Sequence, residues 1–109
     1  MRVVHIASIS EDPFNGVCVV VPEHVRAQSE LADVRFVNVS GVQIGGIEQQ
    51  LEFDGRLPRT KDGSGWLEDV DIVVFHEVYR TRYLRLARVV RAAGVPYIIV
   101  PHGELGAQA

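Results

Sequence analysis

The sequence predicts an α/β fold in which a mainly parallel, Rossmann-like sheet carries helices on both faces. Short apolar runs rich in β-branched residues recur along the chain, as in strands buried on both faces. These runs alternate with segments of helical periodicity, and most joints between them are short. A length of 109 residues fits one domain. We therefore interpret residues 1–109 as a single domain.

The first half of the chain predicts a βαβ unit. Residues 2–8 form an expected first strand, and residues 34–40 form the second. Residues 17–32 lie between them and place valines on one helical face. Pro22 leaves two alternatives, because it lacks an amide donor. We favour a helix from near Cys18 with Pro22 in its first turn over extended valines followed by a helix from Pro22.

The middle of the chain, residues 41–69, has a weaker pattern. Leu51 and Phe53 alternate with polar residues before Asp54-Gly55, which is a hairpin signal. We expect a small β-excursion there. Trp66 follows a glycine-rich loop, and we expect a short helical turn that packs its indole against the sheet.

The last third predicts a strand, a helix and a strand. Residues 71–75 are apolar and β-branched, and residues 79–93 place apolar side chains on one helical arc and arginines opposite it. Gly94 is the expected C′ residue of that helix. Residues 95–100 are then predicted to form a strand buried on both faces, and Pro101 ends it because proline cannot donate to a ladder.

Composition excludes several classes of protein. A net charge of −3 gives no reason to expect nucleic acid as a partner. Cys18 is the single cysteine, so neither an intrachain disulfide nor a cysteine metal cluster is possible. No apolar run approaches a membrane span, and there is no secretory h-region at residues 1–8. We expect a cytoplasmic location, and for that reason we discount the glycosylation sequon that begins at Asn38.

Candidate site residues follow three of the predicted strands. They are Asn15 and Gly16, His76 and Glu77, and His102 and Gly103. Because parallel strands place their carboxyl ends on one edge of a sheet, and ligands bind at that edge in open α/β sheets, we expect these loops to converge.

Each candidate also has a simpler interpretation. Gly16 is equally well a turn glycine or a backbone position that approaches a phosphate at a helix amino terminus. We favour a His76 that ends a strand with its imidazole in water, and solvated carboxylates at Glu77 and Glu104. His102, between proline and glycine, is more credible as a placed side chain. His5 and His24 are interpreted as structural.

The sequence lacks the dinucleotide fingerprint, the Walker A sequence, the G-x-S-x-G elbow and H-E-x-x-H. Gly63-Ser64-Gly65 has no third glycine and does not join a strand to a helix. His76-Glu77 with His102 is only a weak metal signal. We expect neither a metal nor a cofactor.

Four segments together resemble the amino-terminal domain of retaining GT-B glycosyltransferases of family 4. They are RVVHIAS, a loop ending in NGV, DIVVFHEVY and GVPYIIVPHGELG. The resemblance covers nearly the whole chain except residues 41–69, and its last motif is the most specific. It implies the acceptor-side half of a GT-B fold, sugar transfer with retention from a nucleotide-sugar donor to an acceptor, and no metal.

The resemblance also implies roles for residues. Gly16 matches the loop backbone facing the donor diphosphate, Gly103 lies beside it in the site, and His102 matches the histidine that contacts the donor sugar. His76 and Glu77 fall at the acceptor side. Asn15 stands where the family usually has a first glycine. We expect His102→Ala to remove most turnover of a complete enzyme while leaving the fold intact.

The family places most nucleotide-sugar contacts in a second, carboxy-terminal Rossmann-like domain, which these 109 residues do not supply. The resemblance therefore implies a truncated chain that is inactive by itself and exposes apolar sheet surface, which favours self-association.

Two other functions compete with sugar transfer. One is a non-catalytic, receiver-like binding module, suggested by Glu11 and Asp12 but lacking a lysine near its end. The more distant one is a metal hydrolase.

Arginines cluster on one face of the predicted helix at 79–93. They are Arg80, Arg85, Arg88 and Arg91. We favour a solvated helix face over peripheral contact with anionic lipid at the inner membrane surface. Equal sedimentation with neutral and anionic vesicles at low salt would exclude the lipid contact.

Overall fold

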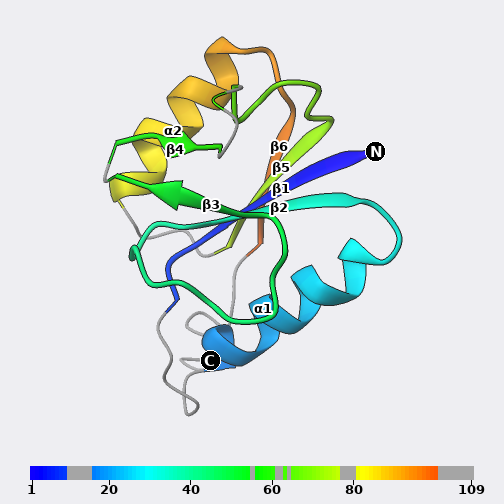
Figure 1. Ribbon diagram of the computed structural model, residues 1–109. Helices are drawn as coiled ribbons and strands as arrows, with labels where there is room; N and C mark the ends of the chain where they lie inside the picture. The colour runs from blue at the N-terminus through cyan, green and yellow to red at the C-terminus, as the bar shows by residue number, and fades with distance from the viewer. Residues whose placement is uncertain (10–15, 55, 61–62, 64, 77–80, 101–109) are drawn as a thin grey trace.

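The computed structural model describes residues 1–9, 16–54, 56–60, 63, 65–76 and 81–100, with only the backbone for 16–19 and 81–82. These residues form a mostly parallel six-stranded sheet and two helices (Figure 1). The α/β class and the mainly parallel sheet are therefore confirmed. In chain order the elements are β1 (Arg2–Ala7), α1 (Gly16–Ser29), β2 (Asp33–Asn38), β3 (Gln50–Phe53), β4 (Pro58–Arg59), β5 (Ile72–His76), α2 (Thr81–Ala92) and β6 (Tyr97–Val100).

The spatial order of the strands is β4-β3-β2-β1-β5-β6, and only β4 runs antiparallel to its neighbour. The expected hairpin at Asp54 is confirmed, because β3 and β4 pair antiparallel across it. The Asp54 carboxylate accepts the backbone N–H groups of Arg56 and Leu57 at 2.8 and 3.0 Å, which shapes the turn and lowers the pKa of that carboxyl.

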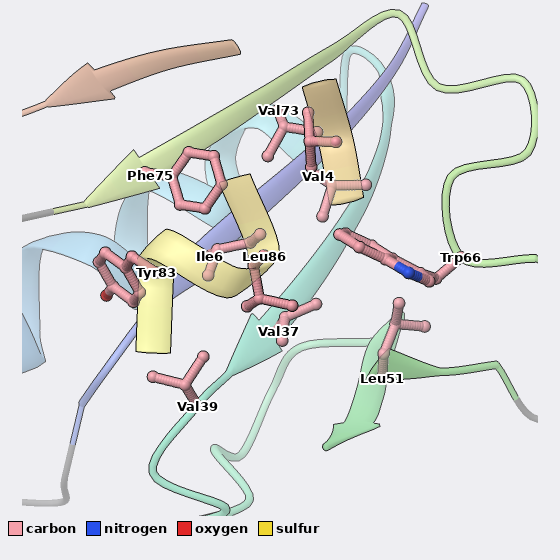
Figure 2. Close-up of a cluster of buried hydrophobic side chains, with 11 residues drawn as sticks. Val4, Ile6, Val37, Val39, Leu51, Trp66, Val73, Phe75, Tyr83 and Leu86 are labelled. Carbon is pink, nitrogen blue, oxygen red and sulfur yellow. The ribbon is translucent and has the colours of Figure 1, made fainter. Parts of the chain in front are cut away.

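Alternating side chains of the strands build two separate apolar clusters. The cluster beside α2 contains Trp66, as expected (Figure 2). Successive residues of each strand alternate between the two clusters, so that Val4 and Ile6 of β1 lie in the cluster beside α2 and Val3 and Ala7 lie in the cluster beside α1. Val21 and Val25 of α1 pack in the other cluster with Phe36 of β2. Figure 1 shows α1 and α2 on opposite sides of the sheet. The central strands β1, β2 and β5 are consequently covered on both sides.

Helix α1 starts earlier than expected, at Gly16, so Pro22 lies inside the helix and not in its first turn. Proline at this position leaves the carbonyl of Cys18 without its intrahelical donor. The cost is offset by burial, since Val21, Pro22 and Val25 are all buried. The valine run is thus helical, as expected, although the placing of Pro22 was wrong.

Helix α2 ends as the sequence predicts. Gly94 has a φ of +74°, its N–H donates to the Arg91 carbonyl at 3.1 Å, and the N–H of Val95 donates to the Val90 carbonyl at 3.2 Å. This is a Schellman cap, which requires a residue tolerant of positive φ. Arg85, Arg88 and Arg91 of this helix are exposed. No helix among the described residues is long and apolar enough to span a bilayer.

Strand β6 contradicts the expectation of burial on both faces. It lies at the edge of the sheet, and the side chains of Ile98 and Ile99 are both 49% exposed. Ile98 and Ile99 point to opposite faces, because successive residues of a strand alternate. The apolar run therefore forms the expected parallel strand, but the described residues do not cover it.

Candidate functional site

Several parallel strands end together at one edge of the sheet, which we call the carboxyl edge. The register pairs Ala7 of β1 with Asn38 of β2, and His76 of β5 with Val100 of β6. Ile6 pairs with Phe75, so β1 and β5 end within one residue of each other. The expected convergence of the ends of β1, β5 and β6 is therefore confirmed.

The described part of the chain contains only some of the predicted site residues. Gly16 is the first residue of α1, and His76 is the last residue of β5. Asn15, Glu77, His102 and Gly103 lie outside the described residues, as does Arg80. Their predicted roles stay predictions.

The order in which the strands are added to the sheet reverses between β1 and β5. From β1 the chain passes through α1 to β2 on one side, whereas β5 and β6 lie on the other side of β1. In open α/β sheets, ligands bind at such a topological switch point, outside the carboxyl ends of the strands. His76 lies at this point, and its imidazole can both donate and accept protons near neutral pH.

His76 is buried and hydrogen-bonded, so the favoured interpretation of a solvated strand-end imidazole was wrong. Its Nε2 lies 2.7 Å from Nδ1 of His5, and the two side chains are only 4% and 2% exposed. The rings stack with centroids 5.0 Å apart. On the far side of His5, Nε2 lies 2.7 Å from Oε1 of Gln28 in α1. Three elements thus contribute to one row of polar side chains, in which the two histidines are buried and Gln28 is half-buried.

Burial governs the electrostatics of this row. Desolvation lowers the pKa of His5 because the charged imidazolium would lose its hydration. The hydrogen bond to Gln28 opposes this shift, while the nearby His24 lowers the pKa further. His5 is therefore held neutral at pH 7.

We expect the protein to lose stability as the pH falls below about 6.5, the ordinary pKa of histidine. The unfolded chain takes up a proton at His5 that the folded chain resists, so the free energy of unfolding decreases with falling pH. Urea unfolding between pH 5 and 8 measures this dependence, and His5→Phe should flatten it. His24→Gln on the exposed side of α1 removes only the smallest cause of the shift and should flatten the dependence less, so an equal flattening in this variant would contradict the assignment to His5.

Asn38 joins the loop after β1 to the loop after β2 by hydrogen bonds at the carboxyl edge. Its Oδ1 accepts the N–H of Ile9 at 3.0 Å and that of Ser40 at 3.2 Å, while Nδ2 donates to the carbonyls of Ile9 and Val42, both at 2.9 Å. The side chain is 3% exposed. A buried amide with both N–H groups bonded is a poor glycan acceptor, which supports discounting the sequon.

Sequence reasoning missed both of these polar clusters. A usable signal for the histidines was present, since His5 interrupts an apolar strand and shares its parity with Val3 and Ala7. Pairing it with His76 required the strand register, in which His5 lies opposite Val74, two residues before His76. Asn38 gave a misleading signal, because its sequon drew attention to modification instead of loop anchoring.

Among the described residues no three histidine, cysteine or acidic side chains gather in a metal-binding group. Nor does any protein-family model, curated protein or solved structure match this chain. The function must therefore be argued from the residues and the geometry of the carboxyl edge.

Proposed function

We propose that this chain is the acceptor-side, amino-terminal half of a retaining glycosyltransferase that uses a nucleotide-activated sugar. The observation that carries the proposal is the position of His76 at the switch point of a parallel sheet, beside the end of β1. The same edge receives the start of α1 at Gly16 and the end of β6, which immediately precedes Pro101-His102-Gly103.

The strand order supports a Rossmann-like half of a GT-B fold. Counting only the parallel strands in chain order, the arrangement is third, second, first, fourth, fifth, which is the doubly wound dinucleotide-binding order. The family resemblance of DIVVFHEVY and GVPYIIVPHGELG falls on the two strands of this half that flank α2. The strand order and the two sequence motifs therefore both support a site at the carboxyl edge.

In this proposal the carboxyl edge forms one wall of a cleft between two domains. Gly16 and Gly103 approach the donor diphosphate, with Asn15 in the same loop as Gly16. His102 contacts the donor sugar, and His76 with Glu77 faces the acceptor side. Water exclusion and alignment of donor and acceptor require the opposite wall, which a second, donor-binding domain provides.

Sugar transfer from a panel of nucleotide sugars tests the proposal, with the 109-residue chain assayed beside the longest natural chain that contains it. We expect transfer by the longer chain and none by the 109 residues. In the longer chain, His102→Ala should remove most turnover without lowering the melting temperature, whereas His24→Ala on exposed α1 surface should leave turnover unchanged.

Comparable turnover by the 109-residue chain would refute the two-domain mechanism. Full activity of the His102→Ala variant would refute the assigned site. Thermal stabilisation by a divalent metal, with none by any nucleotide sugar, would favour a hydrolase. The receiver-like alternative expects no stabilisation by a nucleotide sugar, and the parallel β3 beyond β2 departs from the flavodoxin-like order of receivers.

A further inference from the structure

Gln28, His5 and His76 form a row of hydrogen-bonded side chains. Its two hydrogen bonds link Gln28 on α1 to His76 at the carboxyl edge. Both heavy-atom distances are 2.7 Å, which is short for N–H donors and requires one proton in each contact. A neutral imidazole has one donor nitrogen and one acceptor nitrogen. The proton positions along the row are consequently coupled, and setting one of them sets the others.

The amide of Gln28 determines the direction of the row. Its Oε1 faces His5 Nε2, and an amide oxygen only accepts, so His5 must carry its proton on Nε2. His5 Nδ1 is then an acceptor, and the proton in the contact between the two imidazoles belongs to His76 Nε2. The neutral His76 ring therefore has Nδ1 as its basic nitrogen.

We propose that Gln28, acting through His5, fixes the tautomer of His76 and makes Nδ1 of His76 the proton-accepting atom of the buried pair. Protonation of His76 at Nδ1 keeps both hydrogen bonds of the row intact. A proton on His5 Nδ1 would face the N–H of His76 across 2.7 Å unless His76 moved its own proton from Nε2 to Nδ1, so Nδ1 of His76 carries a proton in either intact arrangement. The pair therefore takes up one proton at His76 and resists a second.

The other groups around His5 agree with this assignment. On α1, His24 is the neighbour whose charge, when present, lowers the pKa of His5 and so opposes its protonation. On the neighbouring strands, the register partners of His5 are Phe36 and Val74, which are uncharged. No described carboxylate is among the groups that shift the pKa of His5. The described surroundings of His5 therefore disfavour its protonation.

This inference gives His76 a specific role within the proposed function, on which the role rests. While it is unprotonated, Nδ1 accepts a hydrogen bond or a proton from a hydroxyl group and cannot donate to a phosphate oxygen. His76 therefore suits a hydroxyl of the sugar acceptor, while the diphosphate belongs to the glycine loops. His5 and Gln28 are positioning residues in this arrangement.

Long-range proton–nitrogen NMR correlations of the imidazole rings test the proposal on the 109-residue chain, with no nucleotide sugar present. At neutral pH we expect a proton on Nε2 of both His5 and His76. A His76 ring that carries its proton on Nδ1 would overturn the proposal. The wild-type spectrum alone decides this point, so the test does not depend on any variant folding.

Two substitutions at Gln28 then test the direction of control. The carboxylate of Gln28→Glu can only accept from His5, so we expect both tautomers unchanged and the titration midpoint of the pair raised by about one pH unit or more. Gln43→Glu adds the same charge at an exposed position and should barely move the midpoint. Gln28→Leu removes the acceptor and should give a mixture of His76 tautomers.

An inverted His76 tautomer in Gln28→Glu, or a midpoint no higher than in Gln43→Glu, would overturn the proposal. A single unchanged tautomer in Gln28→Leu would do so too. In the complete enzyme, Gln28→Glu should move the acid limb of the kcat/KM profile to higher pH. If the tautomers are as expected but the acid limb of the kcat/KM profile does not move, the hydrogen-bonded row is established and the role of His76 in catalysis is refuted. Absence of any transferase activity would refute the proposed function alone.

Discussion

Phe75→Ala is expected to lower the free energy of unfolding by about 3–5 kcal/mol, the usual cost of truncating a buried aromatic side chain. Phe75 is 2% exposed, and it lies on β5 in the cluster beside α2 (Figure 2). Its ring centroid is 5.7 Å from that of Tyr83 in α2 and 5.5 Å, edge-on, from that of Tyr97 in β6. The substitution therefore loosens three elements at once.

Urea unfolding followed by circular dichroism measures this loss. Phe75→Leu retains most of the buried volume and should cost clearly less than Phe75→Ala. Leu84→Ala is the control on α2, because Leu84 is 62% exposed and should change stability by no more than about 0.5 kcal/mol. A Phe75→Ala loss as small as that of Leu84→Ala would show that α2 and β6 do not depend on this contact.

Asn38→Ala is expected to cost about 2–4 kcal/mol, because each buried polar group left without a partner costs about 1–3 kcal/mol. The variant leaves the N–H of Ile9 and the carbonyl of Val42 without their amide partner, while the carbonyl of Ile9 keeps only the hydroxyl of Ser40. The loops after β1 and β2 should also lose protection from hydrogen exchange, since Asn38 joins them. Urea unfolding and amide exchange measure the two effects.

Asn38→Asp sharpens this test, because it keeps the shape of the side chain but replaces a donor of two hydrogen bonds with an acceptor. The new oxygen would face the carbonyls of Ile9 and Val42, so we expect a loss at pH 7 that shrinks on acidification, when the carboxyl becomes a donor. Ser40→Ala removes only the neighbouring hydroxyl and should cost about 0.5–1.5 kcal/mol. Equal losses in Asn38→Ala and Ser40→Ala would show that the Asn38 amide is not the anchor.

Local signals in the sequence were sufficient for most elements. The apolar β-branched runs predicted β1, β2, β5 and β6 to within about two residues, because β-branched side chains favour the extended backbone of a strand. Gly94 predicted the end of α2, since a Schellman cap needs positive φ. Asp54 predicted the β3–β4 turn, because its side chain bonds the turn backbone directly.

The sequence also predicted which strand ends would converge, but it did not predict the burial of His76 at that edge. The convergence of strand ends at the carboxyl edge follows from parallel pairing alone, which the alternation of strands and helices implies. The state of His76 does not follow from its own neighbours in sequence. Its partner His5 is 71 residues away, and Gln28 lies on a helix whose start the sequence left between two alternatives.

By itself, the sequence determined the α/β class, the parallel strands, the cap at Gly94 and the edge at which β1, β5 and β6 end. Each depends on contacts between residues near in sequence or on the chirality of the chain. Only the tertiary structure decided that Pro22 lies inside α1, that β6 is an exposed edge, and that His76 is buried against His5. Those outcomes depend on which elements pack against a residue, and the free energy of burial comes from distant parts of the chain.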